Sequence, residues 1–79
     1  MNDLQQEKAI LVKSYLNPAF KFMRPDDFRT ARYVQNGHSE RVDVFYRDGC
    51  MKAVDVTGLS LEETANIVLV RAFLGRAHY

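Results

Sequence analysis

The sequence predicts an α+β fold in one small domain: a helix, a three-stranded antiparallel meander and a second helix, with both helices packed on one sheet face. Three observations predict it. Apolar residues recur at helical spacing near both ends of the chain. Between positions 29 and 56 they alternate with polar residues instead, as strands do. Turn signals at Asn36-Gly37 and Asp48-Gly49 divide this alternating region. With 79 residues there is room for only one core.

The first element is predicted to be an amphipathic helix over residues 4–16. Asp3 and Gln6 have the spacing of a capping box at its start. The apolar positions at helical spacing are Leu4, Ile10, Leu11, Val12, Tyr15 and Leu16, and the charged positions outside that stripe are Glu7, Lys8 and Lys13. Asn17-Pro18 predicts the end of the helix, because the residue before a proline is disfavoured in the α conformation. The apolar stripe is interpreted as core.

Residues 17–28 are predicted to be irregular, with Phe20 and Phe22 in extended chain. The sequence leaves open whether residues 25–36 form a strand or a helix. Pro25-Asp26-Asp27 could begin a helix, because proline suits its first position and carboxylates suit its dipole. It could equally be a turn before a strand over residues 29–35, in which apolar and charged residues alternate. We favour the strand.

The meander is predicted to have strands over residues 29–35, 41–47 and 50–56. A connection over residues 36–39 pairs Arg32 with Asp43, an opposite-charge cross-strand pair, and likewise Tyr33 with Val42. A two-residue Asp48-Gly49 turn pairs Tyr46 with Met51 and Val44 with Ala53. The predicted core face is then Ala31, Tyr33, Val42, Val44, Tyr46, Met51 and Ala53. The predicted outer face is Thr30, Arg32, Arg41, Asp43, Phe45, Arg47, Cys50, Lys52, Val54 and Val56.

The last element is predicted to be a helix over residues 61–75. Ser60 and Glu63 form the strongest local signal in the chain, a capping box, and Gly75 is a C-terminal stop. The predicted core stripe is Leu61, Ala65, Val68 and Ala72, flanked by Leu69. The second half of this helix is apolar nearly all round, which exceeds what one small sheet can cover.

The order of elements resembles that of double-stranded-RNA-binding domains, whose final helix begins after a Gly-Ser-type turn much as Gly58-Leu59-Ser60 does here. Such domains carry a basic pair at the start of that helix to hold phosphates. Here those positions are Leu61, Glu62 and Glu63, whose carboxylates repel phosphate. The resemblance therefore implies the element order and not the RNA-binding function.

The sequence predicts no enzyme, no metal site and no cofactor. Cys50 is the only cysteine, and His38 and His78 are scattered, so neither a nucleophile pair nor a set of metal ligands is indicated. Eleven basic and ten acidic residues give no strong electrostatic footprint. No apolar run approaches the ~18 residues of a membrane span. We expect a cytoplasmic protein, because a lone cysteine fits a reducing compartment.

Two surfaces are candidates for function. The apolar excess predicts a homodimer or a protein partner, since exposed apolar patches mark association sites and small domains gain stability from them. Its residues are Val54, Val56, Ile67, Val70, Phe73 and Leu74. The alternative is a nucleic-acid-binding protein that uses basic side chains around an exposed aromatic ring. Those residues are Arg32, Arg41, Phe45, Arg47 and Lys52.

Overall fold

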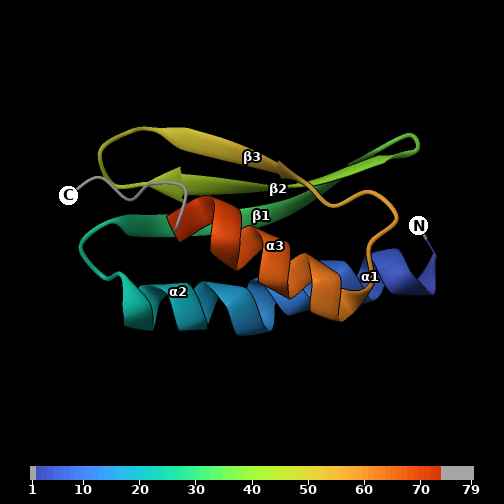
Figure 1. Ribbon diagram of the computed structural model, residues 1–79, viewed down its shortest axis with the longest axis horizontal. Helices are drawn as coiled ribbons and strands as arrows, with labels where there is room; N and C mark the ends of the chain where they lie inside the picture. Colours follow the sequence, from blue (N-terminus) through green and yellow to red (C-terminus); the bar gives the residue numbers. More distant parts are fainter. Residues whose placement is uncertain (1, 74–79) are drawn as a thin grey trace.

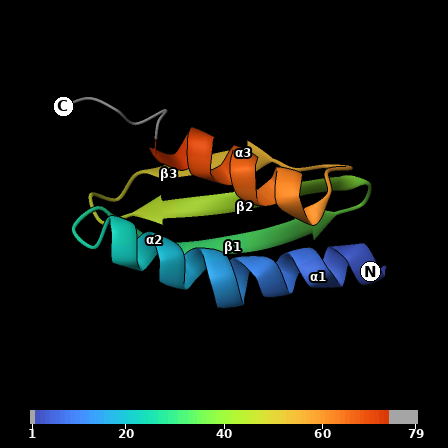
Figure 2. The ribbon, with the colours of Figure 1, turned by 60° about the horizontal axis from the view of Figure 1, so that its bottom comes forward.

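The structure, a computed structural model, describes residues 2–73 and confirms the predicted α+β fold. The elements are helix α1 (Asp3–Leu11), π-helix η1 (Val12–Leu16), helix α2 (Asn17–Met23), strands β1 (Phe28–Asn36), β2 (Ser39–Tyr46) and β3 (Met51–Asp55), and helix α3 (Leu61–Phe73). The three antiparallel strands lie in the order β1-β2-β3. In Figure 1, α1, η1 and α2 form one rod beside β1, and α3 crosses the sheet. Figure 2 shows both helical layers on the same side of the sheet.

The long rod presents a stripe of side chains to the sheet at every fourth position. Lys8, Val12, Leu16 and Phe20 are all buried. A straight α-helix has 3.6 residues per turn, so a four-residue repeat would drift away from the sheet. The π turn over Val12–Leu16 takes in more residues than an α turn and offsets this drift. The stripe therefore stays on the core from Lys8 to Phe20.

The prediction that the helix ends at Asn17-Pro18 was wrong. The Asn17 backbone N–H donates to the carbonyl of Val12, five residues earlier, and closes the π turn. Pro18 then occupies the first turn of α2, where a missing N–H and a fixed φ are tolerated. Phe20 and Phe22 are consequently helical rather than extended. The N-cap is also one residue earlier than predicted, because Asn2 and Gln5 form the capping box.

Asn17 ties the rod to the edge of the sheet. Its side-chain Nδ2 donates to the carbonyl of Val12 at 2.8 Å and to the carbonyl of Ala31 at 2.8 Å. Its Oδ1 accepts from the Ala31 backbone N–H at 3.0 Å and from the Thr30 hydroxyl at 3.2 Å. The amide thus satisfies both backbone groups of an edge-strand residue, as a neighbouring strand would.

We expect Asn17→Ala to destabilise the fold by about 2–3 kcal/mol, because it leaves the part-buried backbone N–H and carbonyl of Ala31 without a partner. Urea unfolding followed by circular dichroism measures this change. Asn66→Ala is the matched control, since Asn66 is exposed on α3 and should change the free energy of unfolding by less than about 0.5 kcal/mol. Equal effects of the two variants would show that the Asn17 amide does not hold β1.

The first half of the meander follows the prediction. Residues 28–36 form a strand rather than a helix, after a turn at Pro25 to Asp27. Arg32 lies opposite Asp43 and Tyr33 opposite Val42. The strands extend to Asn36 and Ser39, so the connection itself is the pair Gly37-His38, with Gly37 at φ 63°. Glycine at the first central position is what a type II′ hairpin turn requires.

The second half of the meander differs from the prediction by one residue. Gly49 donates its N–H to the carbonyl of Tyr46 at 3.1 Å, and Tyr46 donates its own N–H to the carbonyl of Cys50 at 2.9 Å. With Gly49 at φ 93°, this is a three-residue loop, a type I turn followed by a glycine bulge, and not a two-residue turn. Phe45 therefore lies opposite Met51, and Val44 opposite Lys52.

The three-residue loop is one residue longer than the predicted turn. It therefore exchanges the two faces of β3, because side chains alternate along a strand. Val54 and Val56 are buried in the core, whereas Met51 and Ala53, predicted to be core, are exposed. Lys52 moves to the inner face and is half-buried at the sheet edge. This register does not bury the Lys52 charge completely. On an edge strand the long stem can be covered while the ammonium reaches water.

Helix α3 begins with the predicted capping box. The Ser60 N–H donates to the Glu63 carboxylate at 2.9 Å, and the Glu63 N–H donates to the Ser60 hydroxyl at 3.1 Å. The buried residues of α3 are Thr64, Val68, Ala72 and Phe73. The buried face of α3 is therefore rotated slightly about the helix axis relative to the predicted core stripe. Leu61 and Ala65, which were predicted to lie in that stripe, are only half-buried. The predicted stop at Gly75 lies outside the described residues.

Candidate functional site

The predicted association surface is divided by the fold. Val54, Val56 and Phe73 are buried in the core, so their prediction as interface residues was wrong. The β3 register turns the two valines inward, and the Phe73 ring packs against Phe20 of α2 in the core. Ile67 is half-buried and Val70 is 48% exposed, so these two remain available on α3. Leu74 lies outside the described residues.

A groove runs between β3 and α3. It has a volume of about 400 Å³, and its lining comes from both elements and the loop between them. The lining residues are Lys52, Ala53, Val54, Asp55, Thr57, Leu59, Ile67 and Arg71. Leu59, Ile67 and Arg71 also line a shallower hollow on the outer side of α3, together with Glu63, Asn66 and Val70. The β3 edge and the outer side of α3 thus form one continuous surface, which we call the β3–α3 side.

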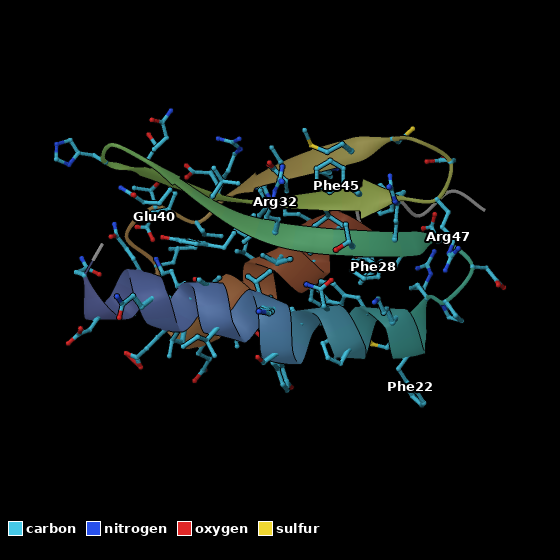
Figure 3. The ribbon with its side chains drawn as sticks, turned by 180° about the vertical axis from the view of Figure 1, so that it is seen from behind. Phe22, Phe28, Arg32, Glu40, Phe45 and Arg47 are labelled. Carbon is cyan, nitrogen blue, oxygen red and sulfur yellow. The ribbon has the colours of Figure 1, made fainter. Side chains whose placement is uncertain are left out.

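The predicted nucleic-acid surface is only partly assembled. Arg32 and Phe45 meet on the outer sheet face, with the guanidinium carbon 5.6 Å from the ring centroid (Figure 3). Arg41 is engaged by Asp43 at 2.9 Å. Arg47 lies beyond the end of β2 and donates to the carbonyl of Pro25 at 3.0 Å. Lys52 is on the opposite face, so the prediction that it surrounds Phe45 was wrong.

A buried ion pair that the sequence reasoning missed closes one end of the core. Lys8 is fully buried, and its Nζ lies 2.8 Å from Glu40 Oε1 and 3.0 Å from the carbonyl of Val56. Glu40 also accepts from the Tyr33 hydroxyl at 2.8 Å and from the Gly58 N–H at 3.1 Å. Three elements and the loop before α3 therefore meet at one carboxylate. Figure 3 shows Glu40 on the side of the hairpin that faces α1.

The sequence does contain a signal for this pair. Lys8 precedes Val12, Leu16 and Phe20 by multiples of four residues, and Glu40 alternates in phase with the inward residues of β2. Burial alone would raise the pKa of Glu40, but hydrogen bonds from Lys8, Gly58 and Tyr33 outweigh it and hold that pKa below its ordinary value. Desolvation, followed by the hydrogen bond to Glu40, raises the pKa of Tyr33.

The polar groups of this cluster bond to one another and hold segments of the fold together. The Lys8 ammonium is covered from solvent, and each polar side chain of the cluster already has a partner within it. A substrate would have to displace Glu40 or Lys8 from these contacts. Cys50 and His38, the other reactive side chains among residues 2–73, lie in different turns, one at each end of β2.

Comparisons with protein-family models, curated proteins and solved structures found no match to this chain. No helix formed by residues 2–73 is long and apolar enough to cross a membrane.

Proposed function

We propose that this chain is a non-catalytic cytoplasmic interaction module that forms a homodimer through its β3–α3 side. β3 is an edge strand, and its outer backbone groups have no partner strand among residues 2–73. The other edge differs, because Asn17 occupies the backbone of Ala31 there. An open edge strand beside an apolar helix is a template for strand pairing.

The observation that carries this proposal is the self-complementarity of α3. Glu63, Ile67 and Arg71 follow one another at four-residue intervals and line the same hollow. A two-fold interface brings the same patch of both copies together. If two α3 helices pack antiparallel about Ile67, Glu63 of each copy lies opposite Arg71 of the other. Neither Arg71 nor Lys52 forms an ion pair with a carboxylate of residues 2–73, so both can meet a partner's acidic group.

We expect the chain to sediment as a dimer at high micromolar concentration, and Ile67→Asp to make it monomeric. An aspartate at the centre of the interface would bury two unpaired carboxylates about the two-fold axis. Ile10→Asp is the matched control: Ile10 is 61% exposed on α1, away from β3 and α3, so this variant should remain dimeric. A wild-type monomer under these conditions would overturn the proposal.

A charge exchange tests the antiparallel arrangement directly. Arg71→Glu alone and Glu63→Arg alone each place like charges across the two-fold axis, so each variant should weaken its own dimer. Mixing the two variants should restore association, because both contacts become attractive in the heterodimer. Glu62→Arg controls for the charge change in the same helical turn, and circular dichroism checks that each variant is folded. Retention of the dimer in both single variants would contradict the antiparallel arrangement while leaving self-association standing.

A further inference from the structure

Four cations without acidic partners gather on both sides of β1. Lys13 and Lys21 come from the rod, and Arg29 and Arg32 come from β1. All four are exposed, and none forms an ion pair with a carboxylate of residues 2–73. By contrast, Lys8, Arg24 and Arg41 each have a carboxylate within 4 Å. Uncompensated positive charge is therefore concentrated at this edge of the sheet, although the net charge of the whole chain is only +1.

Two adjoining hollows carry these cations. The first, of about 420 Å³, lies between the rod and β1 and includes Lys13, Lys21 and Arg32 in its lining. The second, of about 470 Å³, lies on the outer sheet face and is lined by Arg29, Thr30, Ala31, Arg32 and Phe45. Residues 30–32 line both, so the hollows meet at β1. No acidic residue is among the lining residues of either one.

The β1 edge does not bind its ligand by pairing with an added β-strand at Ala31. Asn17 already occupies the N–H and carbonyl of Ala31, so the backbone of β1 is not free to pair there. Polar recognition is left to the side chains. Lys13 and Lys21 are eight residues apart, about 12 Å along a helix, so they can contact successive charges on an extended polyanion.

We infer that this basic edge binds single-stranded nucleic acid. The lysines and Arg29 would contact phosphates, and the planar Arg32 guanidinium beside the half-exposed Phe45 ring offers a stacking surface for a base. The site differs from the one predicted from sequence. It keeps Arg32 and Phe45. In place of Arg41, Arg47 and Lys52 it uses Lys13, Lys21 and Arg29, which have no carboxylate partner among residues 2–73. This site also lies away from the β3–α3 side.

Fluorescence anisotropy with labelled oligothymidylate and oligouridylate, titrated over a range of salt concentrations, tests this inference. The three phosphate contacts of Lys13, Lys21 and Arg29 predict that log K falls with log salt at a slope of about −2.1, at about −0.7 per contact for a single strand. Lys21→Gln should reduce the slope by about 0.7, and Lys13→Gln/Lys21→Gln by about 1.4. Arg47→Gln is the control, because Arg47 is exposed and lines neither hollow, so this variant removes one positive charge and should leave the slope unchanged.

Phe45→Leu separates stacking from charge. It should lower affinity about tenfold at every salt concentration without changing the slope, because it removes a ring and no cation. Circular dichroism confirms that each variant is folded. The inference is overturned if wild type shows no salt-dependent binding at low salt, or if Arg47→Gln reduces the slope as much as Lys21→Gln. Equal affinity for a duplex of the same sequence would overturn the single-strand specificity.

Discussion

Glu40→Ala is expected to destabilise the protein by about 3–5 kcal/mol, because it leaves the Lys8 ammonium buried without its counter-charge. A chain of this size has a free energy of unfolding of about 4–12 kcal/mol, at about 0.05–0.15 kcal/mol per residue. The single substitution therefore removes a large part of the total free energy of unfolding. Guanidinium unfolding measures the loss. Glu7→Ala is the control, since Glu7 precedes Lys8 on the same helix but is exposed.

Replacing both partners should cost less than replacing one. In Lys8→Met/Glu40→Leu neither charge remains, and apolar groups fill the space. The residual cost comes from the Tyr33 hydroxyl and the Gly58 N–H, which lose their acceptor. If the free energy of unfolding of Glu40→Ala stays within about 1 kcal/mol of the wild-type value, the ion pair does not hold this end of the core together.

The same pair gives the stability a defined pH dependence. The pKa of Glu40 is lower in the folded chain than its ordinary value, so the unfolded state binds more protons at acidic pH. The stabilisation is fully present above the ordinary glutamate pKa of about 4.3 and is lost as pH falls through the folded pKa. Glu40→Gln should therefore flatten the acidic limb of the stability curve. Hydrogen bonds from Thr57 also lower the pKa of Asp55, so wild type and variant must be compared directly.

Phe20→Ala is expected to cost about 3–5 kcal/mol through the cavity that it leaves. Phe20 lies at the centre of three aromatic rings. Its ring centroid is 5.4 Å from that of Phe28 and 4.6 Å from that of Phe73, and both contacts are edge-to-face. Such pairs contribute about 0.5–1.5 kcal/mol beyond their buried area. The guanidinium of Arg24 covers the Phe73 ring at 5.3 Å.

Phe22 provides the matched control, two residues along the same helix. It is 86% exposed and points away from the core (Figure 3), so Phe22→Ala should change the free energy of unfolding by less than about 0.5 kcal/mol. A double-mutant cycle with Phe20→Ala and Phe73→Ala isolates the contact between those two rings. Comparable losses from the substitutions at positions 20 and 22 would contradict the aromatic core described here.

Short-range patterns were enough to predict much of this protein. The capping box of Ser60 and Glu63 involves residues three apart, and the alternation of β1 and β2 needs only neighbouring positions. The cross-strand pair of Arg32 and Asp43 follows from a short connection between strands whose apolar faces must match. The fold class and one hairpin register could therefore be predicted from the sequence alone, as could the outward position of Val70.

Other features depend on competition between local preference and packing across the chain. Asp48-Gly49 suits two turn types that differ by one residue in length, and the three-residue loop places Val54 and Val56 in the core instead of Met51 and Ala53. The same shift removes the valines from the predicted interface and Lys52 from the predicted basic face. Both candidate surfaces were thus altered by a single turn, because a one-residue change reverses every side chain of a strand.

The continuation of the helix through Pro18 and the burial of Lys8 have a similar origin. Locally, proline favours a stop and lysine favours water. In the folded chain, the Asn17 amide bonds to β1, and Glu40 supplies a carboxylate 32 positions away in the sequence. Each partner comes from a distant segment, so only the tertiary structure could decide these features, since the stabilising contact does not exist until the sheet and the rod have met.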